Sequence, residues 1–238
     1  GNETILTARQ DITVKAHSIA HLIDFMLAAA ASTDAPAVGA TILVNIFGRE
    51  TSAVIGNDAI LISTNGNVLV QADSHETAVI FSVAGAAASQ NAVSGNIQVN
   101  VPNSITGAFI GGRATVKAWD SIGVTANQDT TVVAISPSLT LGLNSTAVGA
   151  SIQTNVLTNE VRAIIGEYAN LIAYAQNSST NGIQTANRQS KRKGIILSAL
   201  EKDLMVAGGV SAGAGNNAVS GVVETLVNRT TVIANMGT

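Results

Sequence analysis

The chain has 238 residues, of which 46% are hydrophobic, 3% aromatic and 11% charged, and its formal net charge is −3. This apolar content is too high, and the net charge too small, for a disordered chain. The absence of cysteine excludes disulfide bonds and thiolate metal sites. The negative charge and the few aromatic residues argue against nucleic-acid binding. No apolar run approaches the roughly 18 residues of a membrane span, so no membrane-spanning segment is expected.

Four similar segments end in alanine, and the first three of them alternate apolar and polar residues in the way that half-buried strands do. They are DITVKA (11–16), NVLVQA (67–72), SIGVTA (121–126) and GIILSA (194–199). The alanines that close them follow one another at intervals of 56, 54 and 73. The last interval therefore exceeds the repeat period by roughly 18 residues. We assign this excess to one polar insertion at about residues 176–194.

Asparagines and glycines mark the same period between these segments. The markers are Asn45, Asn100, Asn155 and Asn228, with Gly56, Gly111 and Gly166 following the first three asparagines by eleven residues each. The first three asparagines recur at a constant interval of 55, and Asn228 follows Asn155 by 73. We expect the glycines to supply positive φ at corners. The asparagines fit turn positions, which we favour, or an inward ladder.

A period of this length predicts a stacked array, and the strand patterns predict an all-β fold, a parallel β-helix (β-solenoid) with short strands. We expect residues 1–238 to form a single solenoid segment of a longer repeat protein. Each period would hold three coils of about 18 residues or two of about 27; the excess of about 18 favours three, giving a rod about 60 Å long. We also expect strands at 160–175 and 194–207. An antiparallel sandwich is the rival, but Asn-Gly hairpin signals are irregular.

Three stretches resemble the leukotoxin-type filamentous adhesin family, the large secreted β-helical surface adhesins of Gram-negative bacteria. They are SGNIQVNVPNSITGAFIGGRATVKA (94–118), VGASIQTNVLTNEVRAIIG (148–166) and TANRQSKRKGIIL (185–197). The resemblance implies an extracellular, cell-surface β-helical stalk with a role in adhesion or assembly and without catalytic residues. The extra residues and the AVSG variants of AVG depart from the regular unit.

Few residues suggest chemistry, and no cofactor is expected. Arg188, Lys191, Arg192 and Lys193 form a basic cluster inside the insertion, which we interpret as a solvated loop or as a contact with an anionic glycan or a neighbouring subunit. Trp119 is a further candidate for an interaction surface.

Acidic and histidine pairs give weaker signals. Asp73 with Glu76, and Glu201 with Asp203, fit solvated turns, whereas an enzyme would need such acids to converge on one face. His17 and His21 would lie about 13 Å apart on a strand, too far to bind one metal ion.

The sequence therefore predicts a non-catalytic structural or adhesive segment of an extracellular fibre. A dry interior of Ile, Val, Leu and Ala would hold the coils together, and self-association along the fibre is expected. A host surface or glycan is a second expected partner. A carbohydrate-active β-helix enzyme and a glycan-binding module are the alternatives.

Overall fold

The computed structural model describes residues 2–176, 183–184 and 191–237, and these residues are all-β. The strands are β1 (Ile5–Ala8), β2 (Ile12–Ser32), β3 (Ala37–Ile55), β4 (Ile60–Ser63), β5 (Val68–Ala88), β6 (Ala92–Ile110), β7 (Thr115–Ala118), β8 (Ile122–Ile165), β9 (Asn170–Ala173), β10 (Ile183–Gln184), β11 (Lys191–Arg192) and β12 (Ile195–Met236). No helix that could cross a membrane occurs in the described part of the chain.

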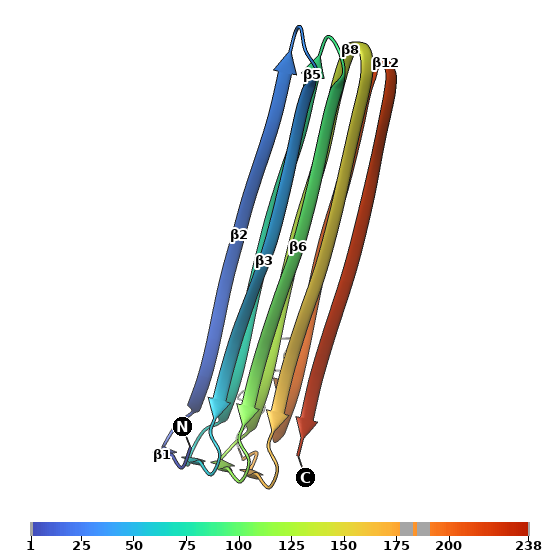
Figure 1. Cartoon of the computed structure of the whole chain (residues 1–238). Coiled ribbons are helices and arrows are strands. Elements are labelled where there is room, and N and C mark those ends of the chain that lie inside the picture. Colours follow the sequence, from blue (N-terminus) through green and yellow to red (C-terminus); the bar gives the residue numbers. More distant parts are fainter. Residues whose placement is uncertain (1, 177–182, 185–190, 238) are drawn as a thin grey trace.

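The chain winds in laps, and each complete lap contains a short strand, a long rising strand and a long descending strand. Figure 1 shows the rising strands β2 and β5 beside the first part of β8, a row of turns at one end, and the descending strands β3 and β6. In β8 and β12 the strand continues through the turn, so each supplies both directions. Equivalent strands of successive laps pair in parallel. The fold is therefore a parallel β-solenoid, as the sequence predicts, and the antiparallel sandwich is wrong.

One lap occupies the whole period, which corrects the expected number of coils. Asn45 pairs in register with Asn100, and Asn100 pairs with Asn155, so one full repeat interval separates adjacent laps. The expected two or three coils per period do not exist, because the Ala-, Ser- and Gly-rich tracts between the predicted strands are themselves strand. Only the strands at the base, β1, β4, β7 and β9, are short, with 4 residues each.

The long axis of the molecule is consequently the strand direction and not the stacking direction. A strand of 21 residues such as β2 extends for about 70 Å, whereas neighbouring laps are only about 4.8 Å apart. The expected rod of about 60 Å along the stacking axis is therefore wrong. The described laps form a tall, thin and twisted plate, with both chain ends at the base (Figure 1).

Close approach of backbones, and not positive φ, explains the repeated glycines. Gly194 is the only glycine with positive φ among the described residues, so the expectation for Gly56, Gly111 and Gly166 is wrong. A Cβ atom on Gly111 would lie 2.5 Å from the backbone nitrogen of Asn57 in the preceding lap.

Positive φ occurs two residues after each marker glycine. Asp58, Arg113 and Tyr168 have φ values of 57°, 55° and 57°. The corner therefore separates two requirements: no side chain at the first position, and a left-handed backbone at the third.

The core has two different compositions along the strand direction. At the base, aliphatic side chains from the short, rising and descending strands pack together, among them Ile55, Val70, Val116 and Ile122. Further along the strands, many inward positions are polar, including Ser82, Asn96 and Gln153, each at most 1% exposed. The expected dry interior of Ile, Val, Leu and Ala is confirmed only at the base and in small clusters above it.

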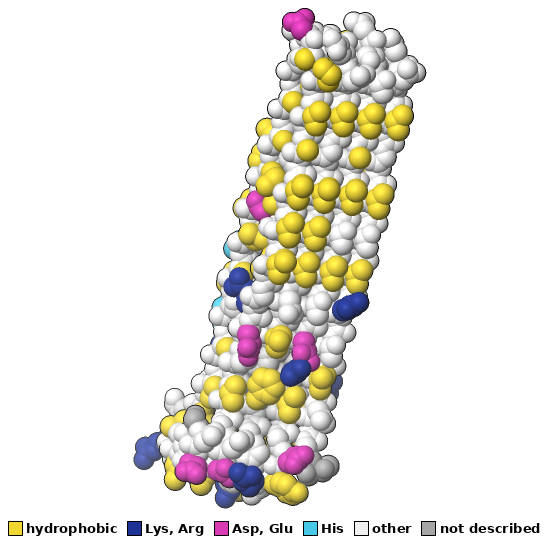
Figure 2. Space-filling view, viewed as in Figure 1, with side chains coloured by type: hydrophobic (Ala, Val, Ile, Leu, Met, Phe, Trp, Pro, Cys, Tyr) yellow, Lys and Arg dark blue, Asp and Glu magenta, His cyan; other side chains and the backbone are white. Residues whose placement is uncertain are grey.

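The composition of the outer faces changes in the opposite way along the strands: apolar residues face outward where the interior is polar. In β2 the apolar residues Ile12 and Val14 near the base face inward, whereas Ile23, Phe25 and Leu27 face outward and are 61–80% exposed. Figure 2 shows rows of apolar side chains across the outer face of the descending strands, with the charged side chains gathered towards the base.

The corner geometry predicts that Gly111→Ala lowers the free energy of unfolding by about 1 to 3 kcal/mol, because the new methyl group would displace the backbone of the neighbouring lap. Chemical denaturation would measure the change. Gly95→Ala is the matched control, since nothing lies within 4 Å of the position of its Cβ. Equal stability of the two variants would contradict the close-approach explanation.

Candidate functional site

The marker asparagines form a ladder in the interior, which is the alternative that sequence analysis favoured less. Asn45 Nδ2 donates to Asn100 Oδ1 at 3.1 Å, and Asn100 Nδ2 donates to Asn155 Oδ1 at 2.7 Å. Asn100 and Asn155 are fully buried. Stacked amides of this kind satisfy one another only when equivalent residues lie in register, so the ladder fixes the register of these laps.

Asn228 does not belong to this ladder. A shift between Gly215 and Asn217 changes the offset between β8 and β12, so that Leu226 pairs with Asn155 and Asn228 pairs with Leu157. Asn155 Nδ2 consequently has no hydrogen-bond partner in the described structure. Sequence spacing misidentified Asn228 because it ignored this shift of two residues. By the same register the fourth corner glycine is Gly237, whose amide donates to Ile165 O at 2.8 Å.

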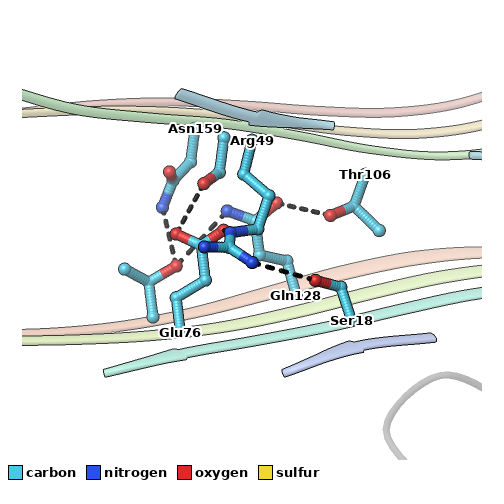
Figure 3. A network of polar contacts seen from close by, with 8 residues as sticks. Ser18, Arg49, Glu76, Thr106, Gln128 and Asn159 are labelled. Atoms are coloured by element: carbon cyan, nitrogen blue, oxygen red, sulfur yellow. Dashed lines mark hydrogen bonds and ion pairs between the residues drawn. The ribbon is translucent and has the colours of Figure 1, made fainter. Parts of the chain in front are cut away.

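Two facing rows of polar residues cross the interior below the ladder (Figure 3). The register aligns Glu76, Thr130 and Asp203 in the rising strands, and Arg49, Ser104, Asn159 and Thr230 in the descending strands. We call these residues the central polar rows. They bring together side chains from every lap of the chain, from Arg49 in the first to Thr230 in the fourth.

An ion pair between the exposed Arg49 and the buried Glu76 begins the central polar rows at the first lap. Arg49 Nε lies 3.3 Å from Glu76 Oε1, and the Glu76 side chain is 6% exposed. Ser104 Oγ donates to Glu76 Oε2 at 2.6 Å, and Arg49 also reaches Ser18 (Figure 3). A buried carboxylate requires such partners, because an unpaired charge in the interior is costly. Glu76 is therefore not in a solvated turn.

Asp203 ends the rows at the fourth lap. Asn159 Nδ2 donates to Asp203 Oδ1 at 2.9 Å and to Thr130 Oγ1 at 3.1 Å. Thr230 Oγ1 donates to Asp203 Oδ2 at 2.9 Å. Nearby, Thr106 donates to Gln128 (Figure 3). The predicted pair Glu201 and Asp203 therefore also lies on a strand, and not in a turn.

Glu201 has an unusual environment within this network. Burial, together with the negative charge of Asp203, raises the pKa of Glu201 to about 8 from an ordinary 4.5. In the fourth lap, Glu201 and Asp203 place two carboxyl groups on one strand. The residues equivalent to Glu201 are Ser74 in the second lap and Gln128 in the third. At neutral pH this geometry favours a protonated Glu201.

A small cavity lies beside the ion pair. It has a volume of about 150 Å³ and is lined by the aliphatic residues Leu22, Ala78 and Val132 together with Phe47, Arg49 and Glu76. Both charged groups of its wall are already paired with each other. The cavity therefore has space for water or a few heavy atoms, and its remaining polar lining residues are His21, Thr77, Thr130 and Thr131.

The predicted interaction residues gather at the base of the molecule. Both ends of the insertion attach to the segment after β7: Gln176 N donates to Trp119 O at 3.3 Å, and Gly194 N donates to Ser121 Oγ at 3.2 Å. Trp119 is 42% exposed and lies 6.3 Å from Tyr174, measured between ring centroids.

The basic cluster stands on the same insertion. Lys191 and Arg192 form β11, an exposed strand that pairs antiparallel with β10, and Lys193 follows it. Arg188 lies outside the described residues. The structure thus places Trp119 and the described basic residues at one end of the molecule.

The histidines are close to each other in a way that sequence spacing did not suggest. His17 and His75 stand on adjacent rising strands, with ring centroids 5.9 Å apart. No group of three or more metal-binding side chains occurs among the described residues.

Sequence reasoning also missed Arg49 as the partner of Glu76. The two residues stand on opposite faces of the solenoid, Arg49 on the descending strand β3 and Glu76 on the rising strand β5. Their separation in the sequence matches neither strand alternation nor the lap period. To place them side by side from the sequence, one would need to know how the rising and descending strands of neighbouring laps face each other.

The raised pKa of Glu201 predicts a pH-dependent stability. Since folding raises this pKa, the stability that protonated Glu201 contributes is fully present below about pH 4.5 and is lost as the pH rises towards 8. We expect the thermal midpoint of the wild-type protein to fall between pH 5 and 8 more steeply than that of Glu201→Gln. Glu167→Gln, at an exposed corner, serves as the control and should keep the wild-type slope. An unchanged slope in Glu201→Gln would contradict this prediction.

The position of the insertion predicts that residues 178–193 can be deleted without unfolding the laps. Ile183 is the buried contact of the described part of this segment, at 6% exposed, so the cost should not exceed about 3 kcal/mol, the burial of one isoleucine. Thermal unfolding followed by circular dichroism would measure it, and Ile183→Ala should reproduce most of the loss. Loss of cooperative unfolding in the deletion variant would show that the insertion is an integral part of the laps.

The geometry thus consists of ladders, paired polar rows and corners that repeat from lap to lap, with exposed basic and aromatic residues at the base. Comparisons with known proteins add no further assignment to these features. No protein-family model, curated protein or solved structure matches this chain.

Proposed function

We propose that this chain is a non-catalytic structural segment of an extracellular fibre on a bacterial surface, in which laps continue by strand addition at both edges. The observation that carries this proposal is the state of the edge strands. Leu226, at the inward position of the Asn ladder, is 51% exposed in β12, whereas Asn100 and Asn155 at the same position are fully buried. The fourth lap is built as an interior lap, but no described part of the chain covers it.

The length of these edges supports the proposal. β12 has 42 residues and pairs with β8 on one side, so its other side offers backbone groups to a further strand along most of its length. Edges that are long and regular are templates for further strands unless charges, prolines or bulges protect them. Only a shift between Gly215 and Asn217 interrupts the pairing of β12. A second copy of this chain, or further laps of the same protein, would satisfy these groups.

The two edges also carry one complementary pair of inward charges. The fourth lap presents Asp203, and the first lap presents Arg49, whose side chain is 39% exposed. When laps stack, Arg49 would lie between Glu76 of its own chain and Asp203 of the preceding copy. Burial of Arg49 between two carboxylates would stabilise the junction and help to select the correct register.

The base supplies the surface for adhesion in this proposal. Lys191, Arg192 and Trp119 repeat once per copy along a stack, so a fibre would display a row of basic and aromatic groups. Such a row suits an anionic glycan of a host surface, because weak contacts at regular intervals add through multivalency. The paired carboxylates Glu201 and Asp203 face the interior, which supports a structural role for them over catalysis.

Assembly of the purified chain in a non-ionic detergent tests the proposal. We expect particles that grow with protein concentration, seen by negative-stain microscopy and analytical ultracentrifugation, with a diffraction spacing of about 4.8 Å along the fibre axis. Leu226→Lys should abolish growth, since stacking would bury the new lysine in register with Asn45 of the next copy, where no carboxylate lies opposite its charge.

Thr231→Lys is the matched control, because Thr231 is exposed on the outer face of the same strand. This control should assemble like the wild-type protein. A chain that stays monomeric at all concentrations, or a Leu226→Lys variant that grows normally, would overturn the proposal.

A further inference from the structure

The outer faces carry one apolar belt at the same height on both sides of the plate. On the rising strands the belt consists of the outward residues within 23–31 and the residues that pair with them in later laps. On the descending strands it consists of the outward residues within 38–46 and the residues that pair with those. Apart from Thr154 and Thr225, every outward residue of the belt is apolar or glycine. The two parts lie directly opposite each other, since both begin at the turn between β2 and β3.

The side chains of the belt are strongly exposed and form continuous rows. Ile23 is 80% exposed and Ile42 is 65% exposed. One row contains Val38, Val93, Val148 and Val219, and the row of Ile42 continues in the next laps (Figure 2). Contiguous apolar patches of this extent mark surfaces that something else covers.

The height of the belt identifies what covers it. Eight residue steps along a strand span about 26 Å. The hydrocarbon core of a bilayer is about 30 Å thick, and the apolar band of membrane-spanning strands is about 25 Å tall. No outward position of the belt is charged, whereas Glu50, Glu160, Arg162 and Lys202 stand on the outer faces below it.

The interior at the same height supports a lipid environment as well. Thr41 donates to Asn96 at 2.9 Å, and Ser136 donates to Gln153 at 2.9 Å, both within the buried space between the sheets. Polar groups inside and apolar groups outside are the reverse of a water-soluble protein, and they suit strands that face hydrocarbon. Packing of copies face to face would need one copy on each side to cover both parts of the belt, whereas a single bilayer covers both sides of the plate at once.

We propose that the apolar belt is embedded in a lipid bilayer, with the strands across the membrane and the stacking direction in its plane. The base, with its charged residues and the insertion, then projects into water. The open edges of the belt would be costly in hydrocarbon, because lipid offers no partners to backbone groups. This inference rests on the proposed function in that stacked laps would cover these edges.

Flotation with phosphatidylcholine vesicles tests the inference on the whole chain, and the wild-type protein should float with the vesicles. Ile42 and Ile152 lie at the middle of the belt height, so the double variant Ile42→Lys/Ile152→Lys should lower the vesicle-bound fraction at least about tenfold. The matched control Val54→Lys/Ile164→Lys places the same charges on outward positions of the same strands, but below the belt. It should float like the wild-type protein.

Depth-dependent quenching supplies a second measurement. The chain has one tryptophan, Trp119, at the base. Brominated acyl chains should leave Trp119 unquenched and should quench the new indole in Trp119→Phe/Ile42→Trp several-fold.

The inference would be overturned if the wild-type protein did not float, or if the control variant lost flotation as strongly as Ile42→Lys/Ile152→Lys. It would also be overturned if copies associated face to face without binding vesicles and Ile42→Lys/Ile152→Lys abolished that association. A chain that assembles in detergent but does not float would overturn this inference alone. A chain that floats but does not assemble would overturn the fibre alone.

Discussion

Backbone hydrogen bonds between parallel laps are the interaction on which the rest of this structure depends. Each long strand pairs residue for residue with its equivalent one lap away, along the whole of β2 and of β3. Such pairing forces identical positions of successive laps into columns about 4.8 Å apart. Every other feature, from the Asn45–Asn100–Asn155 ladder to the corner glycines, repeats because the columns repeat.

The column constraint explains how so many polar residues can be buried. A buried amide or hydroxyl is tolerated when it has hydrogen-bond partners, and a column supplies one partner above and one below at fixed spacing. The ladder satisfies its amides in this way until β12, where Leu226 replaces the asparagine and leaves Asn155 Nδ2 unpaired in the described structure. In the central polar rows, buried polar groups find partners between the rising and the descending strands, and Arg49 neutralises Glu76.

Because the interior need not be apolar along its whole length, the apolar residues of each long strand face inward near the base and outward near the turns. At the base they enclose an aliphatic core, and nearer the turns their apolar side chains face outward. The polar interior, the apolar belt and the open edges are connected, because a plate with apolar outer faces and unpaired edges is stable only when both are covered. In the proposed fibre, stacking would cover the edges, and a bilayer would cover the faces.

The sequence by itself determined the all-β class, the parallel solenoid and the period, because residues such as Asn45, Asn100 and Asn155 repeat at the spacing of one lap. It did not determine the number of coils in a period, since Ala, Ser and Gly occur equally in turns and in strands that pack closely; only tertiary pairing decided between them. The position of Asn228 and the source of positive φ at Asp58 likewise depended on the register of neighbouring laps, which no local pattern specifies. The ion pair of Arg49 with Glu76 was equally hidden, because two sheets facing each other bring together residues that neither alternation nor period connects. Local alternation thus identified the strands at the base, whereas pairing between laps decided that the Ala-, Ser- and Gly-rich tracts are strands too and what each side chain contacts.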